Sequence, residues 1–140
     1  SLYIAAPLFN PQERALNEHI DSRLSNFFKI FLPQRDGILI PNHLINAEEF
    51  ARLSSDVFTI DTAAIRACDC ILAVLDGRTI DEGVSFELGY AYALGKTCIG
   101  YRTDARSLLP YGNNPMIDNC LKFQFRSEED LIHWASGKTL

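Results

Sequence analysis

The sequence predicts an α/β fold in which a single doubly wound, five-stranded parallel sheet carries helices on both faces. Short runs that are apolar at every position alternate with longer segments of helical period, as in sheets that are covered on both sides. Asn, Asp and Ser residues stand at the helix starts as N-caps. The 140 residues contain no repeat, linker or low-complexity segment, so we expect one domain over 1–140.

The first half of the chain contains two predicted strands and two predicted helices. Residues 2–9 (LYIAAPLF) predict a buried strand that runs into a turn. Asn10-Pro11-Gln12-Glu13 then combines an N-cap, a proline at the first helical position and an acid at the third. The apolar stripe of this helix comprises Leu16, Ile20, Leu24, Phe27 and Phe28. Residues 37–41 (GILIP) predict the second strand, and a helix follows over about 46–68, which Ser54-Ser55 could interrupt.

The second half contains three predicted strands. Residues 70–76 (CILAVLD) and 97–101 (TCIGY) are apolar on both faces, and 122–125 (KFQF) is a short last strand. Between the first two, a helix is expected over 81–95, from the N-cap Asp81 to Gly95 just past its end. Residues 102–113 predict a loop, and a terminal helix begins after Ser127.

This succession predicts the flavodoxin-like strand order 2-1-3-4-5 with right-handed crossovers. Ligands in such sheets bind beyond the carboxyl ends of the strands, where the strand order reverses. Those ends are predicted at residues 5–9, 41–43, 76–81 and 101–104. We therefore expect the functional site among these four segments.

Charge and composition narrow the classes of partner. The net charge of −5 and the scattered Lys and Arg residues argue against nucleic acid or an anionic membrane. No apolar run reaches the roughly 20 residues of a membrane span. The 47% of hydrophobic residues and the four cysteines, of which three lie in apolar context, are typical of a globular cytoplasmic protein with buried free thiols.

Neither a metal nor a cofactor is expected. Cys68 and Cys70 are too close for a usual zinc knuckle, and the three histidines lack metal-binding spacing. No glycine-rich turn follows the first strand, which argues against a dinucleotide or a nucleoside triphosphate.

Glu87 is the one charged residue inside an otherwise apolar helix. Helical side chains lean toward the N-terminus, so Glu87 projects over Gly83, where no side chain competes for space. A surface glutamate is the simplest alternative, but the adjacent residues offer no polar face. Because unpaired buried carboxylates are rarely kept for stability, we interpret Glu87 as functional.

Asp61 presents the same anomaly on the preceding helix. Its helical neighbours are apolar, so burial should raise its pKa unless a cation lies nearby. A raised-pKa acid beside an ionised carboxylate is the pair that acid-assisted glycosyl transfer needs. The alternative is an N-cap within a broken helix.

Other candidates carry weaker signals. Asp76 and Asp81 bracket the loop after the third strand, where a turn and an N-cap are sufficient explanations, and Arg78 between them is expected in solvent. Tyr3 lies inside the first strand, where its hydroxyl needs a polar partner such as a carboxylate of the crevice.

The segments YIAAPLF (3–9), DTAAIRACDCILAVLDG (61–77), DEGVSFELGYAYALGKTCIGYRTD (81–104) and NPMI (114–117) resemble the nucleoside 2-deoxyribosyltransferase family. The resemblance covers nearly the whole chain, and D-x-G-x-x-x-E-x-G-x-A is its most specific part. The family transfers 2-deoxyribose between purine and pyrimidine bases through a covalent glycosyl-enzyme. It includes a branch that hydrolyses deoxynucleoside monophosphates.

The resemblance implies a role for each matched residue. Glu87 falls on the nucleophile, Asp61 on the acid that protonates the leaving base, and Tyr3 on the tyrosine that orients the nucleophile. Asp81 and Asn114 match residues that hold the 5′ end of the sugar. The family takes the Asn and Met of N-x-M from a neighbouring subunit, which implies a homo-oligomer with Asn114 and Met116 completing another chain's site. The remaining expected substrate contacts are Asp76, Gly83 and Phe9.

Three features depart from the family pattern. Ala6 stands where many members have glycine, residues 41–44 (PNHL) lack a base-reading glutamine, and residues 136–140 (SGKTL) lack a terminal tyrosine. The expected activity is deoxyribosyl transfer between bases, with deoxynucleosides and nucleobases as ligands. The alternatives are an N-glycosidase acting on deoxynucleosides or their 5′-monophosphates, a non-catalytic nucleoside-binding module, and an electron carrier on the same fold. Asp81 favours nucleosides, because its carboxylate would repel a 5′-phosphate.

Overall fold

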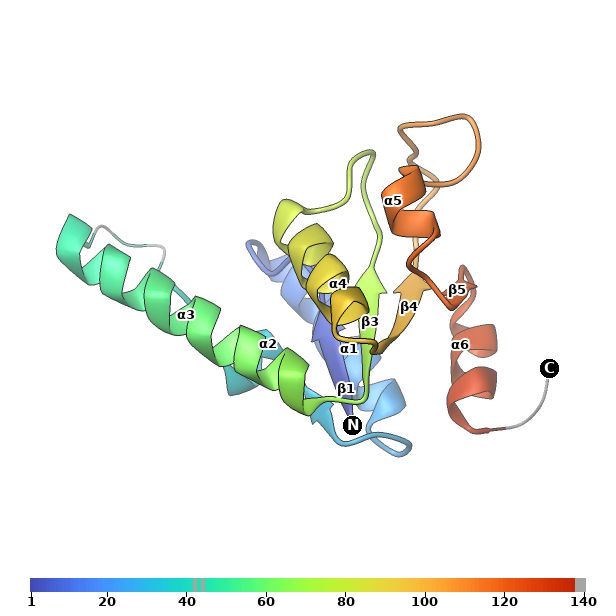
Figure 1. The fold of residues 1–140 in the computed structure, drawn as a ribbon, viewed down its shortest axis with the longest axis horizontal. Helices are drawn as coiled ribbons and strands as arrows, with labels where there is room; N and C mark the ends of the chain where they lie inside the picture. The colour runs from blue at the N-terminus through green and yellow to red at the C-terminus, as the bar shows by residue number, and fades with distance from the viewer. Residues whose placement is uncertain (42, 44, 138–140) are drawn as a thin grey trace.

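The computed structural model describes residues 1–41, 43 and 45–137. Its five strands form one parallel sheet in the order β2-β1-β3-β4-β5, as the sequence predicted (Figure 1). The strands are β1 (Leu2–Ala5), β2 (Ile30–Phe31), β3 (Cys70–Val74), β4 (Thr97–Tyr101) and β5 (Phe123–Phe125). The helices are α1 (Pro11–Leu24), α2 (Pro33–Asp36), α3 (Ala47–Ala67), α4 (Glu82–Ala93), α5 (Pro115–Asp118) and α6 (Glu128–Ala135).

Side chains on the two faces of the sheet form two separate cores. One core packs Ile4, Leu72 and Ile99 against α1 and α6. The other packs Tyr3 and Ile71, on the opposite face, against α3 and α4. All five residues of β3 are buried, as expected of a central strand in a parallel sheet.

The second strand lies earlier in the chain than the sequence predicted. Residues Ile30–Phe31 pair with Leu2 and Tyr3, whereas the predicted strand 37–41 lies outside the sheet. Helix α1 ends at Leu24 and α2 begins at Pro33, so the chain turns and enters the sheet between these two residues. Because proline favours the first turn of a helix and cannot donate to a strand ladder, it ends β2 after two residues.

Most helix boundaries follow the predicted caps. The side chains of Asn10, Asn46, Asp81 and Ser127 each accept a hydrogen bond from a backbone N–H in the first turn of their helix. Gly95 adopts φ 71° just past the end of α4, the left-handed conformation that favours glycine there. Helix α3 runs through Ser54 and Ser55 without a break, because serine lowers helix stability only modestly.

The long helix α3 reaches beyond the edge of the sheet at its N-terminal end (Figure 1). Its C-terminal half packs beside α4. All four cysteines are free, and three of them are buried. In the part of the chain that the structure describes, no helix combines the length and apolar character that crossing a membrane requires.

Candidate active site

A cavity of about 700 Å³ opens at the carboxyl end of β1. Its walls come from the loop after β1, the start of α1, the segment 38–41, α3 and the first turns of α4. The lining residues are Ala6, Leu8, Phe9, Arg14, Pro33, Ile38, Leu39, Ile40, Pro41, Phe50, Val57, Asp61, Asp81, Gly83, Val84 and Glu87. Five of the expected site residues therefore meet in this cavity: Phe9, Asp61, Asp81, Gly83 and Glu87.

A hydrogen bond from the sheet positions the side chain of Glu87. The hydroxyl of Tyr3 on β1 donates to Oε1 of Glu87 across 2.6 Å. Burial raises the pKa of Glu87 to about 7; the hydrogen bond from Tyr3 opposes this shift, and the negative charges of Asp61 and Asp81 add to it. The polar partner that Tyr3 needed is thus the carboxylate of Glu87.

The surroundings of Tyr3 keep its hydroxyl protonated and its ring in place. Its side chain is fully buried, and its ring stacks on Phe31 with centroids 5.5 Å apart. Burial and the charges of Glu87 and Asp61 raise its pKa well above the ordinary range. Tyr3 is therefore a permanent hydrogen-bond donor that sets the direction of the Glu87 carboxylate.

Asp61 lies in the interior of an unbroken helix, so it is not an N-cap. Its Oδ1 is buried and has no hydrogen-bond partner among the described residues, and burial raises its pKa to about 6. The backbone of Gly37 lies close to it, since a Cβ at that position would stand 3.1 Å from Oδ1. Burial is the cause of this shift, and none of the described Lys and Arg side chains forms an ion pair with Asp61.

The two carboxylates share one proton near neutral pH. With pKa values of about 7 for Glu87 and about 6 for Asp61, the pair loses its first proton near pH 6 and its second near pH 7. Between these two pH values the remaining proton resides more on Glu87 than on Asp61. This differs from the expectation that Asp61 alone is protonated, because the charges of Asp61 and Asp81 add to the effect of burial at Glu87, whereas burial alone acts on Asp61.

Asp81 has a structural role as well as a place in the cavity. Its Oδ1 accepts from the N–H of Val84 at 3.0 Å and caps α4. A Cβ at residue 83 would stand 3.1 Å from the same oxygen, so Gly83 leaves the capping carboxylate room. The second carboxylate oxygen of Asp81 takes no part in the capping bond.

Asp76 and Arg78 lie outside this cavity. Asp76 accepts hydrogen bonds from the N–H and the hydroxyl of Thr103 and from the N–H of Asp104, so it ties together the loops that follow β3 and β4. Its carboxylate is therefore occupied within the protein. Arg78 lines a different cavity on the other side of α4.

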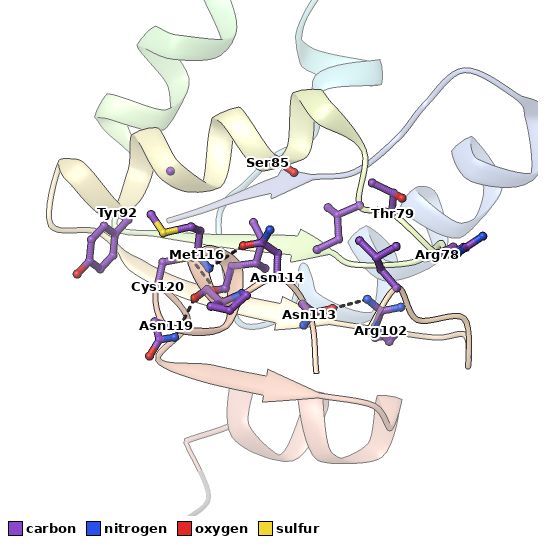
Figure 2. Close-up of a pocket in the computed structure, with 15 residues that line it drawn as sticks. Arg78, Thr79, Ser85, Tyr92, Arg102, Asn113, Asn114, Met116, Asn119 and Cys120 are labelled. Carbon is purple, nitrogen blue, oxygen red and sulfur yellow. Dashed lines mark hydrogen bonds between the residues drawn. The ribbon is translucent and has the colours of Figure 1, made fainter. Parts of the chain in front are cut away.

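This second cavity, of about 810 Å³, contains Asn114 and Met116 (Figure 2). Asn114 caps α5 by accepting from the N–H of Met116 at 2.9 Å, and the side chain of Met116 is 80% exposed. Within one chain, helix α4 separates these residues from Glu87. Neither residue lines the cavity of Glu87 in its own chain.

A family model described as nucleoside 2-deoxyribosyltransferase matches residues 2–132. The chain belongs to this family. No curated protein matches the sequence.

Solved structures match over nearly the full length. A conserved protein from Enterococcus faecalis V583 is 25% identical with a TM-score of 0.78, covering 99% of this chain and 98% of its own. The 2-deoxyribosyltransferase from Bacillus psychrosaccharolyticus is 22% identical with a TM-score of 0.75, covering 94% and 89%. The CMP N-glycosidase BcmB from Clostridium botulinum is 17% identical with a TM-score of 0.57, covering 96% and 97%. The fold thus matches both a deoxyribosyltransferase and an N-glycosidase.

Sequence reasoning missed two parts of the cavity that contains Glu87. Arg14 is its one cationic lining residue among those described, and its Nη1 donates to the carbonyl of Leu8 at 3.0 Å. The sequence feature that could have indicated Arg14 is its position, one turn into a helix that follows the carboxyl end of a strand. The segment 38–41 was also missed, because its apolar run matches a strand as well as a cavity wall.

Two of the expected departures from the family fall partly outside the described residues. Residues 42 and 44 belong to the segment without the glutamine, and residues 138–140 belong to the segment without the tyrosine. The third, Ala6, lines the cavity and is nearly buried. Among the described residues, no three His, Cys, Asp or Glu side chains gather as a metal site requires.

Proposed function

We propose that this protein cleaves the N-glycosidic bond of 2′-deoxynucleosides and transfers the deoxyribose to a second base. The observation that carries the proposal is the hydrogen bond from Tyr3 to Glu87, in a cavity that also holds the unpaired acid Asp61. A buried carboxylate held in one direction suits a nucleophile, and a second carboxyl of raised pKa suits a proton donor.

The proposed reaction has two steps. An oxygen of Glu87 bonds to the anomeric carbon while the bond from that carbon to the base nitrogen breaks, and Asp61 gives its proton to the departing base. A second base then attacks the anomeric carbon, releases Glu87 and loses its proton to Asp61. Water in place of the second base yields free deoxyribose, so transfer and hydrolysis share the first step.

The roles proposed for Glu87 and Asp61 determine which ionisation state of the pair can react. Glu87 must be ionised to attack, and Asp61 must hold the proton it donates. With one proton shared between them, this state exists as one of two arrangements of the singly protonated pair. The hydrogen bond from Tyr3 favours it, because that bond stabilises the ionised form of Glu87.

We further propose that a second copy of the chain completes the site. Asn114 and Met116 lie across α4 from Glu87 in their own chain, and Met116 exposes most of its side chain. The family resemblance places both residues in the site of a neighbour. An assembly of at least two chains is therefore expected.

An N-glycosidase acting on deoxynucleoside 5′-monophosphates is the second candidate. It is favoured by Arg14, a cation in the same cavity as Glu87. Asp81 opposes it, because a phosphate charge about 4 Å from a carboxylate costs roughly 4 kcal/mol at an effective dielectric of 20. That cost corresponds to about a thousandfold in binding. We therefore propose that nucleosides are the better substrates.

The deciding experiment incubates the protein with deoxyinosine, with and without adenine, and separates the products. Transfer predicts deoxyadenosine and hypoxanthine, hydrolysis predicts free deoxyribose with hypoxanthine, and a non-catalytic binding module yields no product. Deoxyinosine 5′-monophosphate is assayed in parallel on the wild type, Asp81→Ser and Arg14→Ala. We expect Asp81→Ser to narrow the preference for the nucleoside. A wild-type preference for the monophosphate that Arg14→Ala removes would establish the N-glycosidase instead.

A further inference from the structure

Resting on the proposed function, we propose that the substrate's base lies on an apolar shelf and is selected by its apolar area. We define the shelf as six of the apolar residues that line the 700 Å³ cavity: Ile38, Leu39, Ile40, Pro41, Phe50 and Val57. None of these side chains can donate or accept a hydrogen bond. A base held there is recognised by contact with its ring and its substituents, while the hydrogen-bonding groups on its edge contribute little.

The position of the base follows from the position of the acid. Asp61 must touch the base nitrogen to protonate it, whereas Glu87 must touch the sugar. Along α3, the residues that share the cavity with Asp61 are Val57, one turn before it, and Phe50, about two turns further. A base in contact with Asp61 and directed away from Glu87 therefore lies over Val57 and Phe50.

The segment 38–41 lines the same cavity. It starts beside the acid, because Gly37 lies against Oδ1 of Asp61, and it continues with Ile38, Leu39, Ile40 and Pro41. The side chain of Leu39 is 43% exposed and that of Phe50 is 51% exposed. A planar base against these side chains removes apolar surface from water, which favours binding.

A smaller apolar pocket competes for the same role. It measures about 270 Å³, lies between α3 and α4, and also reaches Asp61 and Glu87. Its aromatic walls are Phe58 and Phe86, whose rings pack with centroids 5.8 Å apart. We assign the base to the larger cavity, because only that cavity also contains Asp81, the expected partner of the sugar.

The first test measures the binding of free bases by calorimetry. Purine and benzimidazole have the same shape, but benzimidazole lacks the nitrogens of the six-membered ring. We expect their dissociation constants to agree within about threefold, and we expect affinity to rise by about fourfold per carbon from uracil to thymine to 5-ethyluracil. Benzimidazole binding more than tenfold weaker than purine, or a flat pyrimidine series, overturns the proposal.

The second test uses a matched pair of variants. Phe50 and Phe86 are equally exposed at 51%, but Phe50 lines only the larger cavity and Phe86 only the smaller one. Phe50→Ala should weaken every base by about tenfold, and Phe86→Ala should change binding by less than twofold. The reverse pattern moves the base to the smaller pocket and overturns the assignment. Circular dichroism and thermal melting establish that both variants fold.

Failure of this inference is separable from failure of the proposed function. Base binding is measured without turnover, whereas cleavage of deoxyinosine is measured by its products. A protein that binds bases by apolar area and cleaves nothing refutes the proposed function alone. A protein that transfers deoxyribose but binds benzimidazole more than tenfold more weakly than purine refutes selection by apolar area and leaves the proposed function intact.

Discussion

Tyr3 and Glu87 are 84 positions apart in the chain, yet a hydrogen bond between their side chains joins the sheet to the proposed nucleophile. Each residue was conspicuous in the sequence for the same physical reason, a polar group among apolar neighbours. A buried hydroxyl and a buried carboxylate both need a partner, and each supplies the other's. This part of the candidate site was therefore predictable from sequence.

Replacing the proposed nucleophile should remove activity and stabilise the protein. Burial raises the pKa of Glu87 from an ordinary 4.5 to about 7, so its ionisation opposes folding as the pH rises through that range. Glu87→Gln keeps an acceptor for Tyr3 and never ionises. We expect no turnover, and a free energy of unfolding above that of the wild type by roughly 2–3 kcal/mol at pH 8. The gain should vanish below about pH 4.5 in denaturant titrations, and an equal gain at both pH values would contradict this origin.

The rate should depend on pH as a shared proton requires. We expect kcat/KM to rise as the pH passes about 6, when the pair loses its first proton, and to fall above about 7, when it loses the second. Tyr3→Phe removes a bond that favours ionised Glu87, so the alkaline limb should move to higher pH and the maximum should drop. Loss of activity with an unchanged alkaline limb would mean that Tyr3 acts only through packing.

At the scale of helices and strands, caps were more informative than apolar runs. The four predicted N-caps each form their hydrogen bond, because capping depends on a residue and its nearest neighbours alone. The second strand was assigned wrongly, because residues 37–41 and 30–31 are both short and apolar. Only their distances from the other elements decide which of them pairs with β1.

One glycine of β4 should be required by packing. A Cβ on Gly100 would stand 2.7 Å from a methyl of Leu75 and 2.8 Å from a methyl of Leu121, so these side chains would have to move. We expect Gly100→Ala to lower the free energy of unfolding by about 1–3 kcal/mol in urea titrations. Gly89→Ala is the control, because among the described residues its added carbon meets no atom within 4 Å outside the adjacent helix backbone. Equal stability changes for the two variants would exclude the packing explanation.

At the scale of the molecule, α4 is a wall between two cavities. Glu87 lines one of them, while Ser85, Gly89 and Tyr92 line the other. Sequence reasoning found residues of both cavities but could not divide them from the residues alone, since the division depends on how α4 is rotated against the sheet. Arg14 was missed for a similar reason, because Asp61, Asp81 and Glu87, which line the cavity with it, are remote from it in sequence.

Mixing two inactive variants should restore activity if neighbouring chains share a site. Glu87→Ala removes the proposed nucleophile, and Asn114→Ala removes a residue expected to serve the neighbour. After subunit exchange, half of the dimers are mixed and hold one intact site of two, so about a quarter of wild-type activity should return. A mixture of Glu87→Ala with Asp61→Asn should recover nothing, because both residues line one cavity of one chain. No recovery in the first mixture would mean that each chain completes its own site.

The single tryptophan of the chain belongs to the core on the far face of the sheet. Trp134 packs against Phe28, Phe123 and Phe125, in the core that contains α1 and α6, whereas Glu87 and Asp61 lie over the opposite face. Its emission spectrum should therefore follow the loss of tertiary structure and stay constant when a base or nucleoside enters the cavity. The molecule thus carries an optical reporter of unfolding that is insulated, by the thickness of the sheet, from the events at its proposed active site.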